Sequence, residues 1–324
     1  MHDTDMWNKA SFLTRLVASS VRVSEAAGNA IKSVMTGGDL KIVDKSSNGE
    51  PADPQTEADR RAQFLIIKSL SERFGNIRII GEEDVTSECD TVENTFSNEV
   101  LRLEDEMSQD LKSIKPEEVV VWVDPLDGTS EVALAVKNKN EALLEQVTVL
   151  IGIAYHGRPV AGVIHQPYHR GTGRTIWAIK GCGVHGLVPA SAQKERIVVT
   201  TRSHLNQNVL DALDSLKGKG LACGVEKFGG AGFKVLKVLE GCAAYVFASP
   251  GCKKWDTCAP EAVLTAAGGK LTDISGRDLC YDANVQRNNT GGVLASAPWV
   301  NHEDYINCIP QSLKYQLPEI AAKR

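Results

Sequence analysis

The sequence lacks an excess of basic residues. Its 324 residues include 36 Lys plus Arg against 41 Asp plus Glu, a formal net charge of −5 with His neutral. Proteins that bind nucleic acid without sequence preference depend on clustered Lys and Arg to contact phosphates. The balance argues against nucleic acid as a partner. An anionic ligand would have to be held by local chemistry, against the overall charge.

A basic leader and long apolar runs are also missing. Residues 1–5 are acidic where a signal or transit peptide would be basic, and no apolar core segment follows them. Apolar stretches such as residues 147–155 are about half the length that spans a bilayer. We therefore expect a cytoplasmic protein that makes no use of a membrane.

Cysteine patterns typical of zinc ribbons and disulfide frameworks are absent. The sequence has eight cysteines without a CxxC pair, and the nearest two, Cys252 and Cys258, are six residues apart. Scattered cysteines of this kind favour reduced thiols in an intracellular protein.

What is present is an ordinary globular composition, 42% hydrophobic and 24% charged, which predicts one or two compact domains. Apolar spacing predicts an amphipathic helix over residues 12–35 and, after a capping box at Thr56 to Asp59, a second helix over 58–74. The acidic tract 86–116 predicts exposed helix and loop. Its role and any partner for it stay open.

Strands and helices then alternate along the chain. Strands are predicted at 77–80, 119–123, 147–155, 159–164, 174–179, 196–200, 243–247 and 269–274, and later helices at 206–216, 231–240 and 256–267. This alternation favours a layered α/β fold. We place a boundary near residue 166, between an N-terminal α+β subdomain (1–165) and a C-terminal α/β subdomain (166–324).

Acidic side chains gather directly after two of the predicted strands. One group is Gly81-Glu82-Glu83-Asp84, and the other is Asp124-Pro125-Leu126-Asp127-Gly128-Thr129. Carboxylates brought together at strand ends repel one another unless a cation neutralises them, and hard oxygen ligands select Mg²⁺ or Mn²⁺. Taken singly, each segment is more often a turn or a solvated surface. Asp256, in a third segment, could be merely a helix N-cap.

In combination, the three segments resemble the signatures of the inositol monophosphatase superfamily, whose members are lithium-sensitive, magnesium-dependent phosphatases. The segments at 53–60, 201–204, 229–232 and 245–260 resemble more narrowly the 3′(2′),5′-bisphosphate nucleotidases of that superfamily. The resemblance covers about residues 12–298. It implies a layered sandwich of alternating helix and sheet layers, α/β (α+β), in two subdomains with the site between them.

The resemblance also implies a set of site residues. Two to three Mg²⁺ ions would be held by Glu82, Asp124, the Leu126 carbonyl, Asp127 and Asp256. Asp53 and Thr129 would be the catalytic pair that takes a proton from the attacking water. Glu83 would either orient a water at the metal or be merely exposed. Thr201, His204, Gly230 and Lys234 would hold the substrate.

The activity implied is removal of the 3′-phosphate from 3′-phosphoadenosine 5′-phosphate, giving AMP and phosphate. Li⁺ would inhibit this activity. The cellular role of the enzyme would be to remove 3′-phosphoadenosine 5′-phosphate, a by-product of sulfate transfer. The partner is then a small bisphosphorylated nucleotide, and no protein partner is evident. Two alternatives stay open: an inositol polyphosphate 1-phosphatase or inositol monophosphatase activity, and a relative that binds nucleotide and metal without catalysis.

The sequence departs from the nucleotidase pattern directly after the Asp-Gly-Thr motif. Ser130-Glu131-Val132 stands where Lys-Glu-aromatic is usual, and residues 136–144 predict a lengthened loop. The proposed metal ligands are unaffected. The breadth of substrate specificity, including relative activity on nucleotide and inositol bisphosphates, stays open, as does the oligomeric state.

Overall fold

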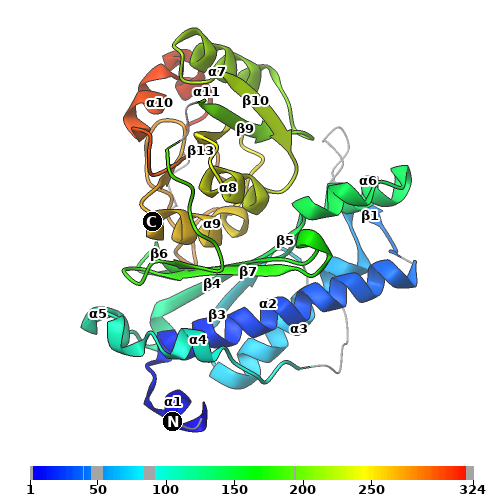
Figure 1. Ribbon diagram of the computed structural model, residues 1–324, viewed down its shortest axis with the longest axis vertical. Helices are drawn as coiled ribbons and strands as arrows, with labels where there is room; N and C mark the ends of the chain where they lie inside the picture. Colours follow the sequence, from blue (N-terminus) through cyan, green and yellow to red (C-terminus); the bar gives the residue numbers. More distant parts are fainter. Residues whose placement is uncertain (1–2, 39, 45–53, 84–91, 193–194, 319–324) are drawn as a thin grey trace.

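The computed structural model describes residues 3–38, 40–44, 54–83, 92–192 and 195–318. Helices and sheets alternate in layers (Figure 1). Helices α2 and α3 lie on one side of a six-stranded sheet, and α8 and α9 lie on its other side. A five-stranded sheet follows beyond α8, with α7, α10 and α11 around it. This arrangement confirms the expected layered sandwich.

The six-stranded sheet has the order β3-β4-β5-β6-β7-β8. Strand β4 pairs with β3 in parallel, and every later neighbour is antiparallel. The register of β4 on β5 shifts between Asp124 and Asp127, so the acidic motif follows an irregular strand end. The strands are β3 (Arg78–Gly81), β4 (Val119–Asp127), β5 (Thr148–Tyr155), β6 (Arg158–Gln166), β7 (Arg174–Ile179) and β8 (Val184–His185).

Two long helices cover one face of this sheet. Helix α2 (Phe12–Gly37) has the predicted amphipathic pattern and ends at Gly38, whose φ of 80° suits glycine. Helix α3 (Glu57–Phe74) starts at the predicted capping box: Thr56 accepts from the Ala58 amide, and the Asp59 carboxylate accepts from the Thr56 amide. Both predictions are confirmed.

Helix α9 (Lys254–Ala266) lies against the opposite face and approaches it at two glycines. A Cβ on Gly152 would come within 2.6 Å of the Ala259 amide nitrogen, and one on Gly162 within 2.5 Å of the Ala259 carbonyl oxygen. Glycine is therefore required at both places by close approach. This contact sets how closely α9 packs on β5 and β6.

The five-stranded sheet has the order β10-β9-β11-β13-β12 and mixes parallel with antiparallel pairs. Its strands are β9 (Ile197–Thr201), β10 (Gly224–Phe228), β11 (Ala244–Phe247), β12 (Lys270–Thr272) and β13 (Val293–Ser296). The helices around it are α7 (Gln207–Gly218), α8 (Ala231–Leu239), α10 (His302–Cys308) and α11 (Gln311–Gln316). Of these elements, β10, β13, α10 and α11 were not predicted.

One sequence expectation was confirmed in part and another was wrong. The described part of the acidic tract forms short helices and loop as expected, but its apolar residues Val100, Met107 and Leu111 are buried, because the short helices pack against α2. Residues 136–144 are not a lengthened loop, because α6 (Thr129–Asn138) continues through the first part and a 3₁₀ helix (Glu141–Gln146) covers the rest. Apolar Val132 and Ala135 anchor α6 to the core.

The remaining elements are short. They are α1 (Asp3–Lys9), β1 (Val43–Asp44), β2 (Pro54–Gln55), α4 (Asn98–Leu101), α5 (Gln109–Lys112) and 3₁₀ helices at Glu104–Glu106, Pro116–Glu118 and His169–Gly171. The subdomain division at residue 166 stays a prediction; β7 and β8 beyond it continue the six-stranded sheet. Among the described helices, none has the length and apolarity to cross a membrane. The seven described cysteines are free thiols.

Candidate active site

Three aspartates from two elements meet at one point. Asp124 and Asp127 come from the end of β4, and Asp256 comes from the first turn of α9. One carboxylate oxygen from each lies within 4.8 Å of the others. Asp124 and Asp127 are buried, and Asp256 is partly buried. The chain thus concentrates up to three negative charges where water is largely excluded.

The raised pKa values in this cluster show that ionising its buried carboxylates together is unfavourable. Burial, followed by the charges of Glu82, Asp127 and Asp256, raises the pKa of Asp124 well above its ordinary value. Burial and the charge of Asp256 raise the pKa of Asp127 to about 6. A divalent cation would reverse these effects, and carboxylate oxygens are the donors that Mg²⁺ prefers. The donor set therefore fits the expected metal.

Glu82 and Leu126 lie at the edges of the cluster. Glu82 follows β3, its amide donates to the Val123 carbonyl, and its charge contributes to the raised pKa of Asp124. The Leu126 amide donates to Asp124 Oδ1 at 3.1 Å, which fixes that carboxylate. The structure thus brings all five predicted ligand residues to neighbouring positions, and their roles as ligands stay a prediction.

Asp256 has two roles in the structure. Its Oδ2 accepts from the Lys253 amide at 2.6 Å, so it is the third residue of a capping box that begins α9. Its carboxylate also contributes an oxygen to the aspartate cluster. The N-cap interpretation and the metal interpretation are therefore compatible.

The hydroxyl of Thr129 is paired with a carboxylate that the sequence analysis did not select. Thr129 Oγ1 lies 2.9 Å from Asp59 Oδ1 and 3.1 Å from the Leu126 carbonyl oxygen. Burial raises the pKa of Asp59 to about 6, although hydrogen bonds from Thr56 and Thr129 oppose this. Asp53, which was expected to pair with Thr129, lies outside the described residues.

Asp59 was visible in the sequence only as the last residue of a capping box. A capping-box carboxylate ordinarily uses its oxygens on the helix N-terminus. In this chain Oδ2 does so, by accepting from Thr56, while Oδ1 accepts from Thr129, seventy positions along the chain. Only the packing of α3 beside the end of β4 reveals this second contact.

Glu83 is buried, which excludes the interpretation that it is merely exposed. Its carboxylate accepts from Gln55, and its amide donates to Gln63 Oε1 at 2.8 Å. Its charge also raises the pKa of Asp59. Glu83 therefore lies beside the Asp59–Thr129 pair and helps to set its electrostatics.

The predicted substrate residues come from the second sheet and its helices. Thr201 ends β9 and is buried, and its Oγ1 accepts from the His204 amide at 3.2 Å. The exposed His204 ring lies edge to face with Phe247, with 6.5 Å between the ring centroids. A flat polar ring at this position is accessible for contact with a ligand.

The start of α8 faces the aspartate cluster directly. Gly230 has a φ of 59°, and a Cβ there would come within 3.0 Å of Asp127 Oδ2. The amides of Ala231 and Gly232 donate to the two Asp127 oxygens at 2.8 and 2.7 Å. Amides at a helix N-terminus often bind phosphate, but here they hold a carboxylate of the protein itself.

Lys234 is a buried cation whose charge acts on that carboxylate. Burial lowers its pKa, while the charges of Asp127 and Glu131 oppose the decrease. Its Nζ lies 5.2 Å from the centre of the Tyr245 ring. A largely desolvated ammonium attracts anions more strongly than one in water.

Glu131 and Arg202 form a contact that the sequence analysis missed. Buried Glu131, on α6, accepts from the guanidinium of Arg202, which follows β9. Gly229 lies against the same carboxylate so closely that a Cβ would overlap it, at 1.7 Å from its carboxyl carbon. This ion pair joins α6, which begins at Thr129, to the segment after β9, which ends at Thr201. The two residues are far apart in the sequence, so no local pattern could indicate the contact.

Comparisons with known proteins agree with this geometry. Residues 13–314 match the inositol monophosphatase family. The chain is 45% identical to rat 3'(2'),5'-bisphosphate nucleotidase 1, covering 96% of this chain and 99% of that one, and 33% identical to the Dictyostelium discoideum protein of that name, covering 93% and 98%. The structure resembles that of the extragenic suppressor protein suhB from Bartonella henselae, with a TM-score of 0.64, 19% identity and coverage of 90% and 96%. The chain belongs to the inositol monophosphatase family.

Proposed function

We propose that the protein is a 3′(2′),5′-bisphosphate nucleotidase, which hydrolyses 3′-phosphoadenosine 5′-phosphate to AMP and phosphate. The observation that carries the proposal is the hydroxyl–carboxylate pair of Thr129 and Asp59 beside the three-aspartate cluster. Full-length identity of 45% to a nucleotidase of this name supports the substrate class.

The metal proposed is Mg²⁺, as two to three ions. Asp124, Asp127, Asp256, Glu82 and the Leu126 carbonyl would hold it. When bound, Mg²⁺ supplies neutralisation of the charge on the transferring phosphoryl group and lowers the pKa of water. Li⁺ is the proposed inhibitor.

The chain's own residues then handle the proton of the attacking water. The Thr129 hydroxyl donates to Asp59, so its oxygen lone pairs are available to accept a hydrogen bond from water. Asp59 is in turn fixed by the Thr56 amide, which limits its orientations. Above pH 6 Asp59 is mostly ionised and accepts the proton that passes through Thr129. Asp59 thus takes the role expected for Asp53.

Substrate contacts are proposed for Thr201, His204, Gly230 and Lys234. The exposed His204 ring, which packs edge to face on buried Phe247, presents aromatic surface for a nucleobase, and Lys234 supplies positive charge beside Asp127. The bisphosphorylated nucleotide would place one phosphate at the aspartate cluster and the other toward these residues. Clearing this by-product of sulfate transfer in the cytoplasm is the proposed cellular role.

The test is phosphate release from 3′-phosphoadenosine 5′-phosphate with purified protein and MgCl₂, with AMP identified by chromatography. We expect turnover that EDTA abolishes and LiCl inhibits. Absence of phosphate above a buffer blank would refute the proposal. Parallel assays measure kcat/KM for inositol 1,4-bisphosphate and for an inositol monophosphate. If either value exceeds that for the nucleotide, the inositol phosphate is the preferred substrate and the nucleotide assignment is wrong.

A further inference from the structure

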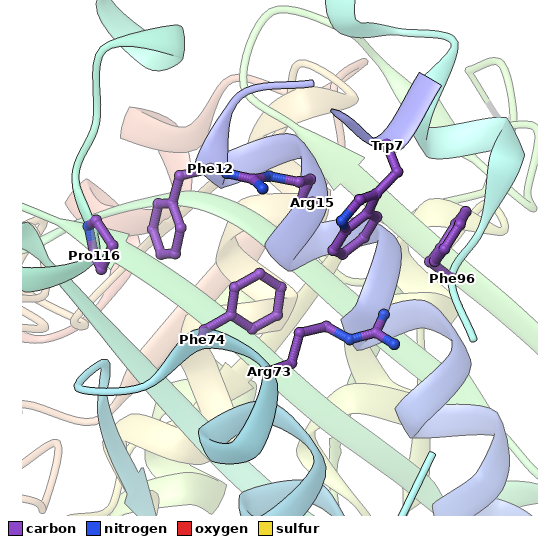
Figure 2. A pocket seen from close by; sticks show the side chains of 7 residues that line it. All are labelled: Trp7, Phe12, Arg15, Arg73, Phe74, Phe96 and Pro116. Atoms are coloured by element: carbon purple, nitrogen blue, oxygen red, sulfur yellow. The ribbon is translucent and has the colours of Figure 1, made fainter. Parts of the chain in front are cut away.

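A cavity lies beside the N-terminal helices, on the outer side of the helical layer. It has a volume of about 400 Å³. Its wall contains Trp7 and Phe12, Phe74 and Phe96, and the arginines Arg15 and Arg73 (Figure 2). Pro116, just before β4, completes it, at the end of that strand opposite to Asp124. None of these residues belongs to the proposed active site.

The aromatic walls are fixed by contacts with one another. Trp7 is stacked on Phe96 with 4.6 Å between ring centroids, and Phe12 meets Phe74 edge to face at 5.8 Å. Figure 2 shows Phe74 and Arg73 on one side of the space and Phe12 and Arg15 on the other. All of these side chains are partly buried, so each presents some surface to the cavity.

The two arginines differ in how their hydrogen bonds are satisfied. Arg73 donates to Ser19 Oγ at 3.1 Å and to the Thr95 carbonyl at 3.2 Å, and its guanidinium carbon lies 4.9 Å from the Trp7 ring centre. Arg73 is thus part of the wall. Arg15 Nε is buried and has no hydrogen-bond partner among the described residues.

Nε itself is closed off from the cavity, but Arg15 lines it, and its guanidinium carbon lies 5.7 Å from the centre of the Trp7 ring, so the Arg15 charge acts on a ligand in that space. A guanidinium beside aromatic faces favours a ligand that combines a negative oxyanion with a flat apolar ring. The volume lies at the lower end of the range of about 300–1,000 Å³ typical of small-molecule sites. Both features point to a compact ligand.

The neighbouring surface argues against a long acidic peptide. Next along α2 is a hollow of about 370 Å³ that shares Phe96 and is lined by both signs of charge, Arg22 with Glu25 and Glu93. Arg22 and Glu25 are already paired at 2.8 Å. The neighbouring hollow therefore carries no excess of positive charge that could bind a longer acidic ligand.

We propose that the cavity between Trp7, Phe12, Arg15 and Phe74 binds a small aromatic anion, with Arg15 donating to its oxyanion and the rings enclosing its aromatic part. The site lies outside the active-site residues and is independent of the proposed nucleotidase activity. It offers a second ligand site on the helical layer.

The test uses 1-anilinonaphthalene-8-sulfonate and its uncharged analogue N-phenyl-1-naphthylamine, titrated into the full-length protein with fluorescence detection. We expect saturable binding of the sulfonate at one site. Arg15→Met, which keeps the length of the apolar stem, should weaken sulfonate binding at least tenfold and leave the neutral analogue within twofold. Arg22→Met, on the same helix, is the matched control and should change neither affinity.

Thermal melting and phosphate release establish that each variant is folded. Arg15→Lys, which retains the charge but replaces the planar guanidinium by an ammonium, should give an intermediate sulfonate affinity. If the sulfonate does not bind the wild-type protein saturably, the cavity holds only water and the proposal is overturned. So would equal sulfonate affinity in the wild type and Arg15→Met, because the probe would then be bound elsewhere.

Discussion

At the scale of single residues, the Asp59–Thr129 hydrogen bond is the contact on which the proposed chemistry depends. Thr129→Val removes the hydroxyl at nearly constant volume, and we expect kcat to fall by about 100-fold or more, since loss of a positioned proton acceptor costs about 10²–10⁴ in rate. Steady-state phosphate release measures this. Thr129→Ser retains the hydroxyl and is the control, expected within tenfold of wild type. Equal activity of the valine variant would remove Thr129 from the mechanism.

The raised pKa of Asp59 predicts the acid limb of the pH profile. Asp59 must be ionised to accept a proton, and burial raises its pKa to about 6. We therefore expect kcat/KM with saturating Mg²⁺ to decrease below pH 6 by about tenfold per pH unit. A rate that stays constant down to pH 5 would show that Asp59 is not the proton acceptor.

Glu261 provides a residue-scale prediction about stability. It is buried in α9, accepts from the Tyr281 hydroxyl at 2.6 Å, and burial raises its pKa to about 7. Because the folded pKa exceeds the unfolded value, the stability from the protonated group is present at acidic pH and is lost as pH rises through 7. Glu261→Gln should therefore be more stable than wild type at pH 8.

The gain expected at pH 8 is on the order of 2–3 kcal/mol, and it should vanish by pH 4.5, where both side chains are neutral. Urea unfolding of both proteins at several pH values measures it. Arg158 lies 3.6 Å from the Glu261 carboxylate but is half exposed, so loss of that ion pair offsets little. A difference in stability that is constant across pH would contradict the assignment.

At the scale of elements, the position of α8 depends on the absence of a side chain at Gly229. A Cβ there would overlap the Glu131 carboxyl group, so Gly229→Ala must displace either Glu131 or the start of α8. We expect a loss of about 1–3 kcal/mol in stability and a lower kcat, because Ala231 and Gly232 at that helix start hold Asp127.

The matched control is Gly218→Ala at the end of α7, where a Cβ meets nothing within 4 Å. This substitution should leave kcat unchanged and stability equal or slightly higher, since alanine loses less backbone entropy in a helix. Thermal melts and phosphate release compare the two variants. Identical behaviour would show that the Glu131–Gly229 contact does not position α8.

At the scale of the whole molecule, the aspartate cluster couples stability to metal. In the metal-free protein, the raised pKa values of Asp124 and Asp127 mean that Tm should increase as pH is lowered from 8 to 6. Mg²⁺ should raise Tm and reverse this trend, with about 2.7 kcal/mol gained at 100 times Kd. Scanning calorimetry with EDTA and with MgCl₂ at both pH values tests this.

Asp256→Asn is the control for the metal effect. It retains an acceptor for the Lys253 amide but removes one charge, so the metal-free protein should melt higher and respond less to Mg²⁺. An Mg²⁺-induced shift equal to that of wild type would show that Asp256 is not a ligand.

Much of the fold followed from local patterns. Apolar periodicity located α2, the Thr56 capping box located α3, and the carboxylates after β3 and β4 indicated where acid would gather. Strand β10 was missed because Gly224 to Phe228 is only partly buried and lacks an apolar pattern. The 136–144 segment was misassigned because its few apolar residues gave too weak a period.

Local patterns were enough to indicate the residue types that a phosphatase of this family needs, because carboxylates after strands and the Asp-Gly-Thr motif can be recognised within short segments. Three pairings depend on how the chain folds: Thr129 with Asp59, Asp127 with the start of α8, and Glu131 with Arg202. Each contact joins residues about 70 to 100 positions apart, and which of several acidic side chains is close enough depends on how the layers pack.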